Sequence, residues 1–369
     1  MPIGQSSGMQ AVLVMQGVLD MKKMFGMKRM LGIKRELGIK RALGVALALG
    51  LSVPGTPAQA EPVELTMSRE YGPQTMMGQR AQQFVDQVAA LSGGELEITF
   101  GEGPLGRLRS VNHLEAISAD IIQLADSHSG ALAAEMPLFG LSSLPTLVDD
   151  PHQARELYRL ARPHYEAQLK EHDQLLLYAL PWPPSGLWSR KPIATRDDLR
   201  GVPVRAYDRN TQRVLLNLGA IATVLGWEPM QQQLAEGRIE AVMTSALGGL
   251  TAELNRTLDH YTALQYAMPL NIVHMSRSRF EALDDTQREA LLAAATEIED
   301  TSWNAIASVL EQTYAQLEEA GVTVSNPLSP KLKRSLARAS VSVIESWRSK
   351  VAPEESELLD RYLAQRDTL

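Results

Sequence analysis

The chain has 369 residues, enough for two domains, and no cysteine, which excludes disulfides, thiolate metal sites and cysteine nucleophiles. Its 44% hydrophobic content is ordinary for a globular protein, and once residues 1–60 are set aside the remaining residues carry a net charge of −13. That charge argues against a surface for nucleic acid or an anionic membrane, so an anionic ligand would need a local, enclosed positive group.

Residues 1–60 have the pattern of a secretory signal peptide. A basic region at 22–41 is followed by an uncharged apolar run from Ala42 to Val53 and by the small-residue site Ala58-Gln59-Ala60. The apolar run is well short of the roughly 20 residues that cross a bilayer. We therefore expect cleavage after Ala60, a periplasmic protein and no stable membrane insertion afterwards. The alternative is a basic amphipathic arm that stays attached.

Residues 61–184 alternate between predicted strands and helices, which is typical of an α/β sheet. Strands are expected at 63–67, 96–100, 121–125 and 175–179, and helices at 75–91, 111–117 and 151–171. Pro137 and Pro145 bracket an apolar stretch that we expect to be non-helical. The run Pro181-Trp182-Pro183-Pro184 is interpreted as a crossing between domains.

Residues 185–272 read as a second α/β unit. Strands are expected at 187–190, 202–207, 221–225 and 239–244, with helical segments at 196–199, 210–218 and 230–236. A second crossing is expected at 272–275, and a strand at 322–324. The pattern from 285 to 320 predicts one helix of roughly 50 Å, long enough to lie along both domains, and 331–363 is largely helical.

The predicted fold class is therefore α/β, with a two-lobed fold like that of periplasmic binding proteins and a long helix spanning both lobes. Lobe I would comprise residues 61–184 with parts of 273–369, and lobe II residues 185–272. Such hinged folds hold a ligand in a cleft between the lobes. A pair of unrelated α/β domains fits the same pattern.

The sequence carries no catalytic signature. It lacks G-x-S-x-G, a Walker A motif, G-x-G-x-x-G and H-E-x-x-H, and its seven histidines are scattered singly. His128 is the histidine of most interest, because it follows a predicted strand end. We expect no enzyme activity, no metal and no cofactor; a periplasmic hydrolase or lyase on two lobes is the enzyme alternative.

Several segments resemble, in the same order, motifs of the dicarboxylate-type solute-binding proteins of TRAP transporters. The most specific is KPIATRDDLRGVPVR at 191–205, which is similar to the family pattern kpI.t.eDLkGlKiR. Further similar segments lie at 103–106, 114–126, 137–150, 219–224 and 234–240. The resemblance covers essentially all of 61–369. It implies capture of a small organic carboxylate and its delivery to the membrane subunits of a TRAP transporter; a sensory ligand-binding protein is the alternative.

In that family the arginine that ends this motif binds the ligand carboxylate, and the matching residue here is Arg205. A guanidinium suits this role because its planar fork matches a carboxylate. Many members have a second arginine 20 positions earlier, where this chain has Ser185, which predicts a monocarboxylate ligand. From spacing alone, Arg205 could instead cap a helix or pair with Asp208.

The rest of the expected ligand set follows from departures from the family pattern and from the aromatic residues. Ser245 or Thr244 would hydrogen-bond the ligand where many members have asparagine. Trp188, Tyr207 and Trp227 are expected beside Arg205, holding an aromatic acid or the apolar body of an aliphatic acid. Glu228 receives no role, because Glu and Pro are exchanged relative to the family.

Overall fold

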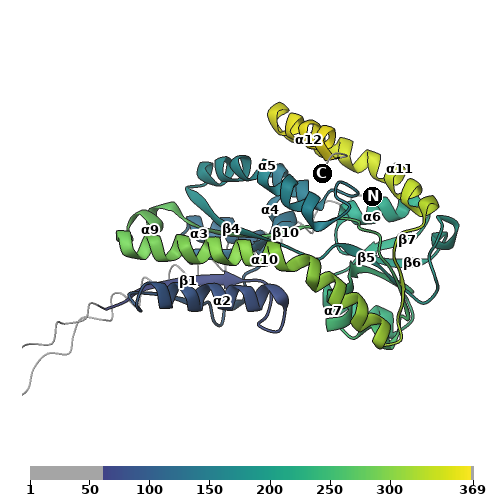
Figure 1. Cartoon of the computed structure of the whole chain (residues 1–369), viewed down its shortest axis with the longest axis horizontal. Helices are drawn as coiled ribbons and strands as arrows, with labels where there is room; N and C mark the ends of the chain where they lie inside the picture. Colours follow the sequence, from purple (N-terminus) through teal and green to yellow (C-terminus); the bar gives the residue numbers. More distant parts are fainter. Residues whose placement is uncertain (1–60, 367–369) are drawn as a thin grey trace, which may run out of the picture. The chain divides into compact units, whose positions relative to one another are not determined.

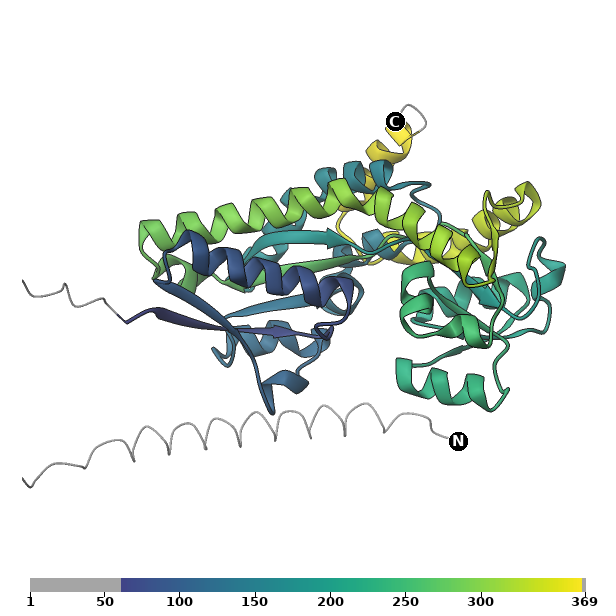
Figure 2. The same cartoon turned by 60° about the horizontal axis from the view of Figure 1, so that its bottom comes forward.

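A computed structural model of the chain describes residues 61–366, apart from the side chain of Glu228. The predicted signal peptide and its cleavage site therefore lie outside the described residues. The described chain is a mixed α/β structure with two sheets, in agreement with the predicted fold class (Figures 1 and 2).

The first sheet has five strands in the order β2-β1-β3-β10-β4. Its strands are β1 (Val63–Arg69), β2 (Leu96–Phe100), β3 (Leu124–His128), β4 (Gln174–Pro181) and β10 (Leu270–Ser276). β1 runs parallel to β2 and β3, whereas β10 is antiparallel to both β3 and β4. The helices of this part are α2 (Met76–Leu91), α3 (Ser110–Ser118), α4 (Ser129–Leu132), α5 (Pro151–Glu171) and α9 (Arg277–Glu281).

The second sheet has six strands in the order β11-β9-β5-β8-β6-β7. Its strands are β5 (Ser185–Ser189), β6 (Pro203–Ala206), β7 (Ile221–Val224), β8 (Ala241–Ser245), β9 (His260–Thr262) and β11 (Thr323–Ser325). The helices among them are α6 (Arg209–Leu218), α7 (Trp227–Ala235) and α8 (Ala246–Thr251). β6 pairs parallel with β7 and β8, and β5 pairs antiparallel with β8.

The long helix α10 (Asp285–Glu319) matches the predicted 285–320 closely. Asp284 caps it in a capping box with Gln287, which fixes its first residue. α10 packs against α2 and β4 of the first sheet and against α8 and β11 of the second (Figures 1 and 2). It therefore spans both lobes, as predicted. The chain then continues into α11 (Pro330–Arg348) and α12 (Pro353–Arg366).

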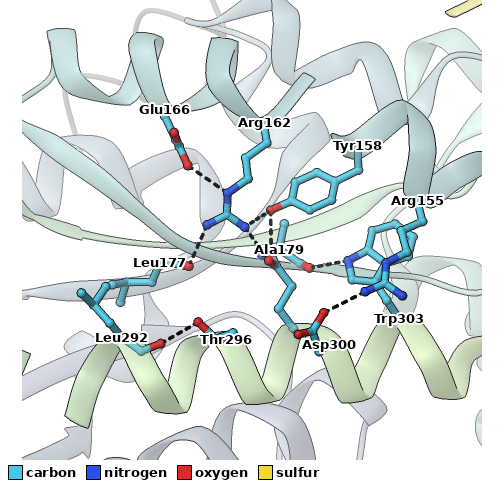
Figure 3. A network of polar contacts seen from close by, with 11 residues as sticks. Arg155, Tyr158, Arg162, Glu166, Leu177, Ala179, Leu292, Thr296, Asp300 and Trp303 are labelled. Carbon is cyan, nitrogen blue, oxygen red and sulfur yellow. Dashed lines mark hydrogen bonds and ion pairs between the residues drawn. The ribbon is translucent and has the colours of Figure 1, made fainter. Parts of the chain in front are cut away.

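The edge strand β4 is covered by α10 through a polar network (Figure 3). Glu299 accepts a hydrogen bond from the backbone N–H of Ala179 at 2.8 Å and from the hydroxyl of Tyr158 at 2.6 Å. The indole of Trp303 donates to the carbonyl of Ala179 at 3.1 Å, and Arg162 pairs with Glu299. The backbone N–H and C=O of Ala179 are thus both satisfied by side chains of α10, which leaves this point of the edge strand unable to pair with another strand.

The two sheets are joined by extended segments that pair with each other. The backbone N–H of Trp182 donates to the carbonyl of Pro269 at 2.9 Å, and that of Ser185 donates to Ala267 at 3.0 Å. The outgoing crossing is thus where the proline run indicated it. The return was predicted at 272–275, which is wrong: those residues form the inner strand β10, and the return lies just before it.

Two further expectations need correction. Pro137–Ser143, expected to be non-helical, is a 3-10 helix, because Pro137 starts it and i→i+3 hydrogen bonds such as that from Leu144 to Leu141 are compatible with the bend. β3 begins at Leu124 rather than at residue 121. The reason is that Asp120 takes a left-handed conformation, and the N–H of Ile121 closes the end of α3 on the carbonyl of Ala116.

Candidate ligand-binding site

Arg205 lies on β6 and is 6% exposed. Its Nε donates to the carbonyl of Leu225 at 3.0 Å, and its Nη1 donates to the carbonyl of Met243 at 2.9 Å. Among the described side chains, which leave out that of Glu228, no carboxylate forms an ion pair with it. Burial lowers the pKa of Arg205 to about 10, while nearby groups such as Asp208 act to raise it. A buried guanidinium held by carbonyls alone is a site prepared for an anion.

The sequence left open whether Arg205 caps a helix or pairs with Asp208, and the contacts of Asp208 distinguish these roles. The side chain of Asp208 accepts a hydrogen bond from the N–H of Thr211 at 2.7 Å and caps α6. Asp208 is therefore the helix cap, and Arg205 neither caps this helix nor forms an ion pair with Asp208. Asp208 is still close enough for its charge to favour the protonated guanidinium.

Two aromatic rings lie beside the guanidinium. The Cζ atom of Arg205 is 5.6 Å from the ring centre of Trp227 and 6.0 Å from that of Tyr207. Trp227 begins α7 and is 39% exposed, whereas the hydroxyl of Tyr207 is buried. The structure thus brings together three of the residues predicted from sequence, at distances that allow cation–π contacts with the guanidinium.

The register of the second sheet places the predicted hydroxyl groups. Arg205 lies opposite Val242 of β8, and side chains two residues apart share a face of a strand, so Thr244 is on the same face as Arg205. Ser185 and Ser245 are direct cross-strand partners at the end of β5 and β8. The hydroxyl of Ser245 accepts from the N–H of Gly248 at 3.0 Å and caps α8.

Trp188 lies apart from these groups. Its side chain has no exposed surface and packs against Tyr261, with ring centres 5.4 Å apart. Its indole donates to the carbonyl of Ser245 at 3.2 Å. In this arrangement Trp188 supports the end of β8 from within the core. The side chain of Glu228, to which the sequence assigned no role, is outside the part of the chain that the structure describes.

Tyr71, which follows β1, lies within electrostatic range of Arg205 and is not among the site residues predicted from sequence. Burial raises the pKa of Tyr71, and the charge of Arg205 acts to lower it, so the two side chains share one electrostatic environment. The ring of Tyr71 packs edge-on against Trp182, with centres 4.8 Å apart. The indole of Trp182 donates to Asn271 at 2.7 Å, and Asn271 donates to Asp126 at 2.7 Å.

His128, noted in the sequence, is the last residue of β3. Its Nδ1 accepts from the N–H of Gly130 at 3.1 Å, which leaves Nε2 as the protonated nitrogen of the neutral ring. Burial lowers the pKa of His128, while the charges of Glu70 and Asp208 act to raise it. Glu70 follows β1 and Asp208 follows β6, so His128 lies within reach of acids from both sheets. A position at or just after the end of a strand is the sequence feature that His128, Glu70 and Asp208 share, and it is the feature by which they could have been found.

A family match spans residues 67–350, to the bacterial extracellular solute-binding proteins, family 7 (DctP). The chain belongs to this family. Family 7 membership makes the chain a binding protein and not an enzyme, and it places the protein outside the cytoplasm, in the periplasm. Among residues 61–366, no helix combines the length and hydrophobicity that a membrane crossing requires.

Solved structures agree with the family assignment. DctP7 of Bordetella pertussis, an extracytoplasmic solute receptor binding pyroglutamic acid, is 27% identical, with a TM-score of 0.75 over 81% of this chain and 99% of that chain. A TRAP solute-binding protein from a marine metagenome, specific for pyroglutamate, is 25% identical, with a TM-score of 0.73 over 82% and 99% of the two chains.

A sequence relative is also known from Albidiferax ferrireducens. This solute-binding protein is 23% identical over 194 residues, which are 52% of this family 7 chain and 57% of the relative. The match thus spans little more than half the length of that curated relative.

Proposed function

We propose that this protein captures a small organic monocarboxylate in the periplasm and delivers it to the membrane subunits of a TRAP transporter. The observation that carries the proposal is Arg205, a buried guanidinium with no carboxylate partner among the described side chains. Membership of family 7 supports it, as do the two relatives that bind pyroglutamate. Secretion would follow cleavage after Ala60.

Binding would begin at Arg205. Its Nε and Nη1 are held by backbone carbonyls, so the guanidinium is fixed in place and its Nη2 edge is left for the ligand carboxylate. Pairing with an anion offsets the unfavourable burial of the charge, and both partners gain from the low polarity around them. The rings of Tyr207 and Trp227 would contact the body of the ligand, and Thr244, Ser245 and Ser185 would supply hydroxyl groups.

Closure would complete the site. We propose that lobe I is built on the first sheet and lobe II on the second sheet, and that the two are joined by the paired crossings and by α10. Movement of the lobes toward each other would bring Tyr71 and Trp182 of lobe I onto a ligand held by Arg205. Excluding water strengthens the ion pair. The closed form would then dock on the membrane subunits and release the acid there.

The proposed ligand carries one carboxylate. Ser185 stands where the resemblance to the family would place a second arginine, and a hydroxyl cannot neutralise a second negative charge. Pyroglutamate is the first compound to test, because it is the ligand of relatives that are 27% and 25% identical. Short hydroxy and keto acids and aromatic acids complete the panel.

Thermal denaturation of residues 61–369 with this panel tests the proposal. An acid at 100 times its Kd adds about 2.7 kcal/mol to the free energy of unfolding, which raises Tm by several degrees. We expect such a shift for the wild type and for the control Arg200→Ala, which removes an exposed arginine. Arg205→Ala should lose the shift. No shift with any acid, or an equal shift in Arg205→Ala, would contradict carboxylate capture at Arg205.

A further inference from the structure

Three buried hydroxyl groups lie next to the carboxylate site. They belong to Tyr207, Thr211 and Tyr266, and among the described side chains, which leave out that of Glu228, none of them has a hydrogen-bond partner. Thr211 and Tyr266 have no exposed surface. Tyr207 as a whole is partly exposed while its hydroxyl is buried, so this hydroxyl points toward the protein interior.

The three hydroxyl groups are neighbours. The rings of Tyr207 and Tyr266 meet edge to face, with their centres 6.4 Å apart. Thr211 lies in the first turn of α6, where the carboxylate of Asp208 holds its backbone N–H at 2.7 Å. Burial raises the pKa of both tyrosines, and the hydroxyl of Thr211 acts to lower the pKa of each, so it lies beside both. The three oxygens are therefore close together without being directly bonded.

Tyr207 connects this group of hydroxyls to Arg205. The Cζ atom of Arg205 is 6.0 Å from the ring centre of Tyr207. The ring of Tyr207 thus lies beside the guanidinium, and its hydroxyl lies beside Thr211 and Tyr266. Whatever fixes this hydroxyl also fixes the ring next to the proposed carboxylate site.

Tyr266 connects the same group to the return crossing between the sheets. Its backbone N–H donates to the carbonyl of Ser185 at 3.0 Å, and its carbonyl accepts from the N–H of Thr146 at 2.8 Å. Because both backbone groups are bound, the backbone of Tyr266 cannot shift toward Tyr207 or Thr211 without breaking one of these hydrogen bonds. The separation of the three oxygens is thus set by the crossing and by the cap of α6.

Hydroxyl groups in this situation call for a small polar partner. A buried polar group without a partner gives up its hydrogen bonds to solvent and gains none, and such groups are rare in folded proteins. Polar groups that are close but not directly bonded are commonly bridged by water. A buried water makes about three hydrogen bonds to groups that would otherwise be unpaired. Three hydroxyls, each able to donate and to accept, match that number.

We propose that one water molecule binds between the hydroxyl groups of Tyr207, Thr211 and Tyr266 and is a fixed part of the ligand site. Thr211 and Tyr266 are then positioning residues, because through the water they hold Tyr207 beside Arg205. A ring that is held in place before binding loses less freedom on binding, which raises the affinity. This positioning role rests on the proposed function, whereas the water site itself requires no ligand.

Crystal structures of residues 61–369 with and without a bound acid, at a resolution that shows ordered water, test the water site directly. We expect one water molecule about 2.6–3.0 Å from the three hydroxyl oxygens in both structures. Direct hydrogen bonds among the three side chains would overturn the proposal. A ligand atom in the place of the water would overturn it as well.

Single substitutions test the positioning role. Tyr266→Phe and Thr211→Val each remove one hydroxyl and keep the shape of the side chain. Isothermal titration calorimetry gives the Kd of the acid, among pyroglutamate, lactate, pyruvate and benzoate, that raises Tm most. We expect each variant to bind it roughly 2- to 10-fold more weakly, the range of one neutral hydrogen bond. Thr211→Ser, which keeps the hydroxyl, should recover most of the affinity that Thr211→Val loses.

Tyr178→Phe is the matched control. Tyr178 is a fully buried tyrosine of the first sheet, and its hydroxyl likewise has no hydrogen-bond partner among the described groups. It has no ring contact with Tyr207 or Tyr266, so the Kd should not change in this variant. A loss of affinity equal to that of Tyr266→Phe would show a general effect of removing a buried hydroxyl and would overturn the positioning role.

The double variant Tyr266→Phe/Thr211→Val separates one shared water from independent side chains. If one water carries the effect, the double variant binds about as tightly as the weaker single variant, because the first substitution already releases the water. Fold-changes that multiply, or an unchanged Kd in either single variant, would overturn the positioning role and leave carboxylate capture standing. No binding of any carboxylate by the wild type would overturn the proposed function, while the crystal structure still decides the water site.

Discussion

Lowering the pH from 7 to about 4.5 is expected to destabilise the first sheet through two buried histidines, His113 and His274. Neither has exposed surface. The hydroxyl of Ser127 lies 2.7 Å from Nδ1 of His113 and 2.8 Å from Nε2 of His274. Nδ1 of His274 lies 2.7 Å from Oε1 of Gln174, whose amide nitrogen donates to the carbonyl of Leu114.

These contacts define one direction of hydrogen bonding with neutral rings. The carbonyl of Leu114 only accepts, so Oε1 of Gln174 is an acceptor and Nδ1 of His274 carries a proton. Nε2 of His274 then accepts from Ser127, and Ser127 accepts from Nδ1 of His113. An extra proton on either ring would face an atom that already donates, or leave a donor buried without a partner.

The pKa values follow the same logic. Burial lowers the pKa of His113 to about 4 and that of His274 to about 3, from an ordinary value of 6.5. Because the folded values are depressed, the unfolded chain binds more protons below pH 6.5. The stabilisation is complete above that pH and is lost as the pH falls toward 4. At about pH 4.5 the loss is roughly 2–3 kcal/mol for each histidine, and less than twice that for the coupled pair.

The pH effect is measured as a difference in stability between wild type and variant, because the carboxyl group of Asp126 makes the folded state more stable as the pH falls. Its raised pKa means that the folded state holds a proton between pH 7 and 4, which offsets part of the loss. Urea unfolding of the wild type and of His274→Gln at several pH values should show that the variant loses less stability on acidification. His152→Gln, at an exposed position, is the control. Parallel pH curves for wild type and His274→Gln would refute the reasoning.

Two substitutions test the packing within each lobe. Glu299→Gln should lower the free energy of unfolding by about 1–3 kcal/mol, since Tyr158, Ala179 and the partly buried Arg162 lose a charged acceptor. Asp300→Asn, at a side chain that is 58% exposed, should change it by less than about 0.5 kcal/mol. Equal effects in urea unfolding would contradict the edge-strand network. Gly249→Ala should cost about 1–3 kcal/mol, because its Cβ would lie 2.1 Å from the indole of Trp188. An unchanged Tm would show that Trp188 is not packed as described.

The elements that could be predicted from the sequence are those with local signals at both ends. Helix α5 was placed correctly because Asp150 caps it and Pro151 is its first residue, and both act within one turn. The start of β3 was missed because the end of α3 depends on the left-handed conformation of Asp120, which no glycine marks. Strand β10 was missed as a strand because its partners lie far away in the sequence.

In the candidate site, too, the residues with local sequence signals could be predicted and those that depend on distant partners could not. Arg205 was found because a contiguous motif surrounds it, and the rings of Tyr207 and Trp227 lie within a short distance of it along the chain. Asn271 and Asp126 are 145 residues apart, and their contact exists only once the first sheet is formed. Local sequence patterns contain no information about such a pair.

A crystal structure with the acid that binds most tightly tests the central claim most directly. The account predicts that the ligand carboxylate lies about 3 Å from the guanidinium nitrogens of Arg205, between the rings of Tyr207 and Trp227. A carboxylate bound elsewhere, with Arg205 still held only by the carbonyls of Leu225 and Met243, would contradict it.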